Sequence, residues 1–154
     1  METYDLSPIK SLSDSLKVRK IRNECRSFMT NDQSEIGILK QISWYLKIYG
    51  SKNKTGEITC YLFRSNGQIL GYGLIRKVSN KSWITGGLLK SERGKGFGKI
   101  LFDSLIGEVP SSEVWLEVLA SNAPARKIYE ELGFKNMEEI QPRGRKIVVM
   151  KLTK

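Results

Sequence analysis

The stretch that decides the fold is Trp83–Ile106, which reads WITGGLLKSERGKGFGKILFDSLI. Its first part, Ile84–Leu89, is an apolar run typical of a β-strand, and its last part carries apolar residues at helical spacing. Between them lies a basic, glycine-punctuated loop, Arg93–Gly98. Such a loop can hold an anion, because glycine N–H groups approach it without interference from a Cβ and the helix dipole favours negative charge. The alternative is a tight strand-to-helix turn with solvated lysines.

Two common nucleotide-binding motifs do not fit this loop. The Walker A pattern requires Lys followed by Ser or Thr after its last glycine, whereas Lys99 is followed by Ile100. The dinucleotide fingerprint requires glycines at G-x-G-x-x-G spacing, whereas Gly94, Gly96 and Gly98 alternate. The loop also has no acidic residue suitably placed downstream on a second strand. Both nucleotide-binding loops are therefore excluded.

Composition limits the chemistry that is available. The sequence has no histidine, so catalytic triads and metal sites that need an imidazole are excluded, and we expect no metal. Cys25 and Cys60 lack metal-ligand spacing and are expected to be reduced core residues of a cytoplasmic protein. The formal net charge of +10 favours an anionic partner, such as nucleic acid, an acidic substrate or a polyphosphorylated cofactor.

Length and hydropathy indicate one globular domain, residues 1–154, that does not enter a membrane. Its 154 residues can bury a sizeable core, and 40% hydrophobic content is ordinary for a globular protein. No apolar run approaches the length of a membrane span, and the polar start METYDLSPIK does not resemble a signal peptide.

The hydrophobic pattern predicts eleven elements in the order β, α, α, β, β, β, α, β, α, β, β. The expected strands are Tyr4–Leu6, Glu57–Ser65, Gln68–Val78, Trp83–Leu89, Glu113–Leu119, Phe134–Gln141 and Lys146–Leu152. Helices are expected from Leu12 to Met29, from Ile36 to Gly50, from Phe97 to the break at Pro110, and from Asn122 to Gly133. This order predicts an α+β domain with a mixed, mostly antiparallel sheet of six to seven strands and four helices. The third helix is a crossover, which makes Glu113–Leu119 parallel to Ile84–Leu89.

Two details of this prediction concern local structure. Gly86-Gly87 indicates a β-bulge or a close backbone approach by a ligand, and a bulge would splay the strand from its neighbour. The second helix is expected to end at Gly50 and to be followed by a loop, Ser51–Gly56. The residues expected on its buried face are Ile36, Leu39, Ile42, Leu46 and Tyr49, with Trp44 and Tyr45 as partial core beside them.

Two motifs in this order resemble the GNAT superfamily of acyl-CoA-dependent N-acyltransferases. Arg93-x-x-Gly96-x-Gly98 matches the superfamily's Q/R-x-x-G-x-G/A pyrophosphate loop. Asn122–Phe134, NAPARKIYEELGF, matches its N-x-x-A-x-x-Φ-Y-x-x-x-G-F helix, where Φ is apolar. The resemblance covers the C-terminal two-thirds of the chain, whereas residues 1 to 55 carry no motif that we can assign. It implies the splayed GNAT sheet, with acetyl-CoA bound at the parallel junction.

The resemblance also implies a set of site residues. The residues implied to bind the cofactor are Leu88, Leu89, Lys90, Arg93, Gly94, Lys95, Gly96, Phe97, Gly98, Lys99, Asn122, Arg126 and Tyr129. The backbone N–H of Leu88 is the implied donor to the thioester oxyanion. Tyr129 is implied to donate a proton or a hydrogen bond to the departing thiolate, and its alternative role is core packing. For Arg126 and Lys127, exposed helix-face charges are an equal alternative.

The sequence offers more than one candidate for the base that deprotonates the acceptor amine. Glu117 is a carboxylate in an otherwise apolar strand. Leu116–Phe134 is particularly similar to ribosomal-protein alanine N-acetyltransferases, in which the matching glutamate is a proposed general base. The alternative is a strand-edge carboxylate paired with a lysine. Thr85 and Gly86 stand where many family members carry a glutamate, so water relayed through Tyr61 or Tyr72 also remains open.

The resemblance implies an enzyme that moves an acetyl group from acetyl-CoA to an amine by direct attack, through a tetrahedral intermediate. One alternative places the amine on an aminoacyl-tRNA, a ribosomal protein or another protein N-terminus, which the net charge favours mildly. A second alternative is a non-catalytic, basic nucleic-acid-binding domain with the same fold. The acceptor, the acyl chain length and the oligomeric state, including a homodimer, stay open at this point.

Overall fold

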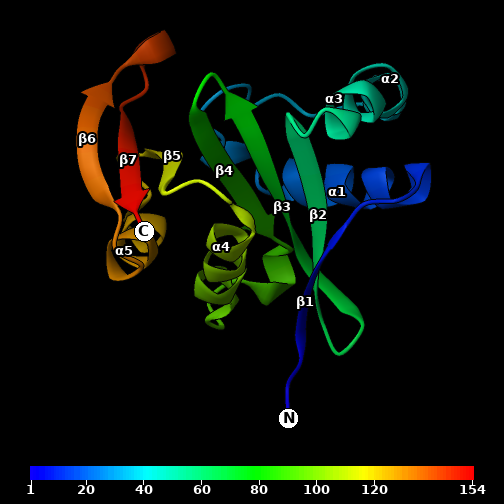
Figure 1. Cartoon of the computed structure of the whole chain (residues 1–154), viewed down its shortest axis with the longest axis horizontal. Coiled ribbons are helices and arrows are strands. Elements are labelled where there is room, and N and C mark those ends of the chain that lie inside the picture. Colours follow the sequence, from blue (N-terminus) through cyan, green and yellow to red (C-terminus); the bar gives the residue numbers. More distant parts are fainter.

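The computed structural model describes all 154 residues as a seven-stranded sheet flanked by helices (Figure 1). The strands are β1 (Tyr4–Pro8), β2 (Ile58–Ser65), β3 (Gln68–Val78), β4 (Lys81–Leu88), β5 (Glu113–Leu119), β6 (Lys135–Ile140) and β7 (Ile147–Thr153). The helices are α1 (Leu12–Glu24), α2 (Ile38–Trp44), α3 (Gly50–Lys54), α4 (Phe97–Glu108) and α5 (Ala123–Glu131). A π-helical turn, η2 (Tyr45–Tyr49), joins α2 to α3, and short 3-10 turns follow α1 and β4 and connect β6 to β7. The predicted α+β architecture is confirmed.

The strands lie in the order β1-β2-β3-β4-β5-β7-β6. Every neighbouring pair is antiparallel except β4 and β5, which are parallel because α4 crosses over between them. The hairpin predicted at Asn66-Gly67 joins β2 to β3, and both residues have positive φ angles, 48° and 81°. A turn with two positive φ angles matches the twist of the strands that it connects.

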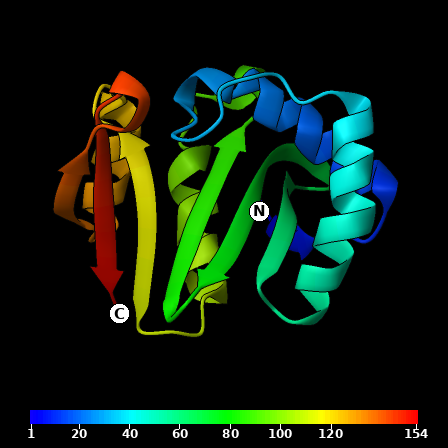
Figure 2. The same cartoon turned by 90° about the horizontal axis from the view of Figure 1, so that it is seen from above.

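The parallel junction is open along most of its length. Only Ser82 and Trp83 of β4 pair with β5, opposite Val114 and Trp115. Figure 2 shows the two strands starting side by side and diverging toward their C-terminal ends. Beyond Trp83, β4 therefore has one edge with no neighbouring strand.

The bulge predicted at Gly86-Gly87 is wrong, because β4 pairs with β3 from Lys81 to Leu88 without a register shift. These glycines serve close packing by the protein itself. A Cβ on Gly87 would lie 2.6 Å from the Cys25 sulfur on the α1 side, and a Cβ on Gly86 would lie 2.8 Å from the Tyr72 carbonyl oxygen. The two strands separate beyond Trp83 and Trp115 although β4 has no bulge.

The sheet separates two hydrophobic cores, because successive residues of a strand face opposite sides. In β2, Tyr61 and Phe63 pack toward α4 and α5, whereas Cys60 and Leu62 pack toward α1 and η2. The larger core lies under α4 and α5 and includes Leu101, Leu105 and Met150, which are fully buried. Both faces of the sheet that contains β4 and β5 are thus covered by a packed core.

The second helix differs from its prediction at both its end and its face. It continues past Gly50, which has helical φ and ψ of −56° and −42°, through α3 to Lys54. Gly56, with a φ of 75°, is the glycine that ends it. The predicted buried residues Leu39 and Leu46 are 83% and 65% exposed, whereas Tyr49 is buried as predicted. The extra residue in the π-helical turn shifts the helical phase, so a stripe counted at regular spacing does not stay on one face.

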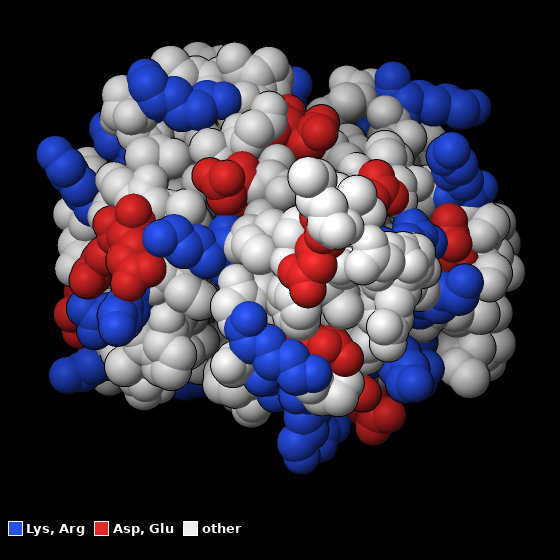
Figure 3. Space-filling view, turned by 90° about the horizontal axis from the view of Figure 1, so that it is seen from below, with Lys and Arg blue, Asp and Glu red and all other residues white.

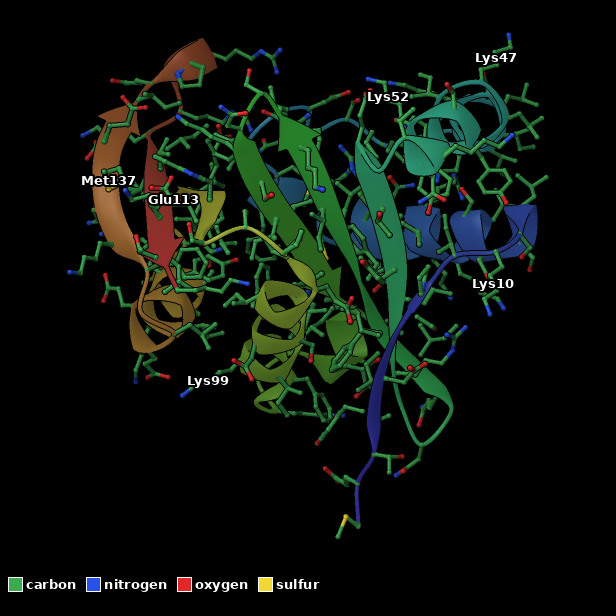
Figure 4. All side chains as sticks on the ribbon, in the orientation of Figure 1. Lys10, Lys47, Lys52, Lys99, Glu113 and Met137 are labelled. Atoms are coloured by element: carbon green, nitrogen blue, oxygen red, sulfur yellow. The ribbon has the colours of Figure 1, made fainter.

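Charged side chains are distributed over the surface. In the face seen from below, Lys and Arg alternate with Asp and Glu and are separated by uncharged surface (Figure 3). Lys47 and Lys52 point outward from the helix formed by α2, η2 and α3 (Figure 4). No helix combines the length and the hydropathy that a membrane span needs.

Candidate active site

The basic glycine loop Arg93–Gly98, here called the cradle, leads into the start of α4. Gly94 and Gly96 have positive φ angles of 75° and 88°, which L-residues with a Cβ rarely adopt. No backbone N–H from Gly94 to Lys99 donates a hydrogen bond within the protein, and α4 has no side-chain cap. A helix N-terminus with such free donors attracts phosphate. At Gly98, a Cβ would lie 3.2 Å from Ile128 of α5, so this glycine permits the two helices to pack closely.

The basic side chains of this region make contacts within the protein. Arg93 Nη2 donates to the Glu24 carbonyl oxygen at 2.8 Å and lies 3.4 Å from Cys25 Sγ, and its guanidinium stacks on the Phe28 ring at 5.2 Å. Lys90 contributes its backbone N–H, which donates to the Glu24 carboxylate at 2.8 Å. Arg93 and Lys90 therefore fasten the cradle to the end of α1.

The two lysines of the cradle form ion pairs instead. Lys95 lies 3.2 Å from Glu92, and Lys99 lies 3.4 Å from Glu131. Figure 4 shows Lys99 reaching from α4 toward α5. An anion in this cradle would thus be held mainly by backbone N–H groups.

The open edge of β4 carries a second set of donors. Leu89 N–H donates to the Leu70 carbonyl oxygen at 2.8 Å, on the β3 side. Because N–H groups alternate in direction along an antiparallel strand, those of Leu88 and Gly86 point the other way, toward β5. β5 has already diverged there, so no strand accepts from them. Leu88 was predicted from the sequence as such a donor; Gly86 was missed, although its position two residues earlier on the same strand could have indicated it.

A cavity of about 1030 Å³ runs between β4 and β5 and joins these groups. The predicted site residues that line it are Leu88, Arg93, Gly94, Gly96, Gly98, Glu117, Asn122 and Tyr129. The predicted residues outside its lining are Leu89, Lys90, Lys95, Phe97, Lys99 and Arg126. Of these, Leu89 packs against the core beneath α1, and the Phe97 ring packs edge-on against Tyr4 at 6.2 Å.

Tyr129 reaches the cavity from the buried face of α5. Its ring packs edge-on against Phe102 at 4.9 Å and Phe134 at 6.1 Å, which fixes its direction. Its hydroxyl makes no hydrogen bond within the protein, unlike the bonded hydroxyl expected of a purely structural tyrosine. Burial raises the pKa of Tyr129, so its hydroxyl stays protonated at neutral pH.

Glu117 projects from β5 on the α1 side of the sheet. Its Oε2 accepts a hydrogen bond from Thr30 Oγ1 at 3.1 Å, and it forms no ion pair. The alternative of a lysine-paired carboxylate is therefore not what the structure shows. Of the two tyrosines considered for a water relay, Tyr72 lines the cavity and Tyr61 does not.

Two residues at the start of α5 have structural partners. Asn122 caps the helix, because its Oδ1 accepts from the Ala125 N–H at 3.4 Å, as predicted. Arg126 is half-buried and donates to the Ala120 carbonyl oxygen at 3.0 Å. It is thus not an exposed helix-face charge, whereas its neighbour Lys127 is exposed.

A strap of residues 29–31 crosses the open end of the cleft, and sequence patterns gave no sign of it. Arg145, from the hairpin between β6 and β7, donates to the Met29 carbonyl oxygen at 2.9 Å and to that of Asn31. Arg143 also donates to the Asn31 carbonyl oxygen, at 3.1 Å. The strap thus links the N-terminal and C-terminal halves across the cavity and positions Thr30 over Glu117. These contacts span more than a hundred residues in sequence, beyond any local pattern.

The fold resembles solved acetyltransferase structures along nearly its whole length. A structure of yncA from Salmonella typhimurium, described with its cofactor acetyl-CoA, has a TM-score of 0.77 at 17% identity and covers 99% of this chain and 93% of its own. A Vibrio cholerae spermidine N-acetyltransferase bound to CoA and spermine has a TM-score of 0.80 at 14% identity, with 97% and 95% covered. A Brucella melitensis ribosomal-protein-alanine N-acetyltransferase has a TM-score of 0.78 at 16% identity, with 99% of each chain covered.

At these identities the likeness shows the fold alone. No protein of curated function matches the sequence. The family model of the acetyltransferase (GNAT) family, however, matches residues 17–134, which include the cradle, β4, β5 and α5. The chain therefore belongs to the GNAT acetyltransferase family of acetyl-CoA-dependent enzymes.

Proposed function

We propose that this chain transfers the acetyl group of acetyl-CoA to an amine by direct attack of the amine on the thioester. The observation that carries the proposal is that two groups of free backbone donors face one cavity. The first is in the cradle, at Gly94, Gly96 and Gly98, and the second is on β4, at Leu88 and Gly86, near Glu117. A pyrophosphate in the cradle would extend its thioester arm along the open edge of β4.

The register of the sheet suggests where the reacting carbonyl would lie. Counting two residues along each strand from the Trp83–Trp115 pair reaches Thr85 in β4 and Glu117 in β5. Gly86 N–H is thus nearer to Glu117 than Leu88 N–H. In this proposal Gly86 N–H stabilises the developing oxyanion and Leu88 N–H orients the arm behind it.

In this proposal one side chain accepts the proton of the amine and another donates to the departing thiolate. Glu117 accepts the proton that the amine loses as its nitrogen bonds to the carbonyl carbon. When the carbon–sulfur bond breaks, Tyr129 donates a hydrogen bond or its proton to the departing sulfur. Its raised pKa favours the hydrogen bond over complete transfer, and solvent restores any proton given up.

A covalent acetyl-cysteine intermediate is not needed and is disfavoured. Burial raises the pKa of Cys25 and raises that of Cys60 to about 12, so both thiols remain protonated at neutral pH. The thiolate is the nucleophilic form, and neither thiol supplies it.

Two measurements test the proposal. Isothermal titration calorimetry should detect acetyl-CoA binding, and an assay of thiol release with a panel of amines should detect acceptor-dependent turnover. Binding without turnover of any amine, including peptides and aminoacyl-tRNA, would count against catalysis. Failure of acetyl-CoA to bind would remove the basis of the proposal.

A further inference from the structure

Positively charged side chains outnumber carboxylates in the cavity wall. The basic residues that line it are Arg19, Arg22, Lys40, Arg76 and Arg93, and the acidic ones are Asp32 and Glu117. A cavity with this excess of positive charge suits a ligand that carries negative charge. The partners of these residues decide which of them is available to a ligand.

Three of the arginines are committed to holding loops in place. Arg19 Nε donates to the Ile36 carbonyl oxygen at 2.7 Å, and Arg22 donates to carbonyl oxygens of the same loop, those of Asp32 and Ser34. Arg93 is bound to the end of α1 and stacks on an aromatic ring.

Lys40 and Asp32 satisfy each other. Lys40 Nζ lies 3.8 Å from Asp32 Oδ2, and Asp32 Oδ1 also accepts from the Ser34 N–H at 2.8 Å and from its hydroxyl. This leaves Arg76 as the one lining cation that makes neither a hydrogen bond nor an ion pair within the protein. It also leaves Glu117 as the only carboxylate for a positively charged ligand.

Arg76 lies on the same face of the sheet as Glu117. It is opposite Trp83 in the β3–β4 ladder. The ring centroids of Trp83 and of Trp115 in β5 lie 5.7 Å apart. Glu117 follows Trp115 by two residues, so its side chain is on the same side of β5. Regular strand spacing, two strands across and two residues along, would put the Cα atoms of Arg76 and Glu117 about 12 Å apart, and the separation of β4 from β5 beyond Trp115 lengthens this distance. Both side chains line the same cavity, so one ligand can contact both.

We propose that Arg76 binds an anionic group of the acceptor, so that the acceptor is a small molecule with both an amine and a carboxylate or phosphate. The amine lies at Glu117 while the anion lies at Arg76, over Trp83. A polyamine has fewer partners here, because Asp32 already accepts two hydrogen bonds from Ser34 and lies 3.8 Å from Lys40. This inference deepens the proposed function and rests on it.

The test compares matched acceptors. Steady-state kinetics would be measured with the twenty amino acids, their amides, ethanolamine phosphate, ethanolamine and spermidine. We expect an amino acid or the phosphate to be preferred over its neutral counterpart and over spermidine. Arg76→Met should lower kcat/KM for the preferred anion about ten- to thirtyfold, and Arg76→Lys less, because a charge-assisted hydrogen bond is lost. The amino-acid and phosphate arms show which anion the site takes.

A control variant and a binding measurement distinguish failure of this inference from failure of the proposed acetyl transfer. Lys77→Met removes an exposed charge on the next residue, whose side chain lies outside the cavity, and should leave kcat/KM unchanged. Calorimetry with N-acetyl amino acids and their amides, on the CoA-saturated protein, reads the site without turnover. A preference for neutral amides or spermidine, or equal effects of Arg76→Met on charged and neutral ligands, would overturn the inference. Unchanged acetyl-CoA affinity in the same samples would leave the proposed function standing.

Discussion

Replacing Thr30 by valine should slow catalysis without weakening the fold. Thr30 Oγ1 makes the only protein hydrogen bond to Glu117, at 3.1 Å, and it comes from the strap rather than from the sheet. Valine has nearly the same shape as threonine but no hydroxyl. The carboxylate would then lose the contact that directs it toward the cleft.

The size of the effect follows from the exposure of the pair. A hydrogen bond to a charged group contributes about 1.5–3 kcal/mol. Both residues are half-buried, so water replaces part of the lost bond and the lower end applies. A loss of about 1.4 kcal/mol in transition-state stabilisation corresponds to a tenfold lower kcat/KM. We therefore expect Thr30→Val to lower kcat/KM for the amine about tenfold.

The assay is initial-rate thiol release at saturating acetyl-CoA, combined with calorimetry of acetyl-CoA and thermal denaturation. Thr30→Ser keeps the hydroxyl and should retain most of the activity. Arg145→Met removes one donor to the Met29 carbonyl oxygen and one to that of Asn31, which Arg143 still contacts, and should act in the same direction as Thr30→Val. Equal losses in the serine and valine variants, or full activity in Thr30→Val, would refute the positioning role.

Three further predictions concern other parts of the site. Tyr129→Phe should lower kcat far more than acetyl-CoA affinity, because its hydroxyl has no partner within the protein to lose. Equal kcat values for the wild type and the variant would exclude a role in thiolate departure. Gly96→Val should abolish acetyl-CoA binding in calorimetry by disturbing the cradle. The control is Gly56→Val, at a similar positive φ of 75° but beyond α3, which should impose similar backbone strain and leave binding intact. Because burial raises the pKa of Cys60 from 9.0 to about 12, the unfolded state loses its thiol proton first, so the free energy of unfolding should fall as pH rises above about 9. Urea denaturation at pH 8 to 11 should show a smaller fall in Cys60→Val, and an identical pH dependence would refute that assignment.

Much of the fold could be predicted because its signals are local. The Asn66-Gly67 turn, the crossover through α4 and the capped start of α5 each depend on neighbouring residues. The π-helical turn at Tyr45–Tyr49 could not be predicted in this way. It adds a residue within a regular pattern, and the exposed Leu39 and Leu46 show the resulting error.

In the candidate site, too, the residues that are contiguous in sequence could be predicted and those brought together by long-range contacts could not. The cradle and the motif of α5 are contiguous in sequence, so their residues could be predicted. The strap depends on Arg143 and Arg145 reaching residues 29–31 from the far end of the chain, and no spacing encodes that contact. The sequence predicted a bulge at Gly86 and Gly87. The structure instead shows that glycine is needed there because Cys25 and Tyr72 leave no room for a Cβ.

The central claim is that the free donors on β4 and at the start of α4 hold acetyl-CoA so that an amine attacks its thioester directly. The most direct test incubates the protein with acetyl-CoA and the amine panel, and measures N-acetyl product by mass spectrometry alongside released thiol. The account predicts one product molecule per thiol released, with no acetylated protein before the amine is added. Acetylation of Cys25 or Cys60 in the absence of amine, or thiol release without any N-acetyl product, would contradict it.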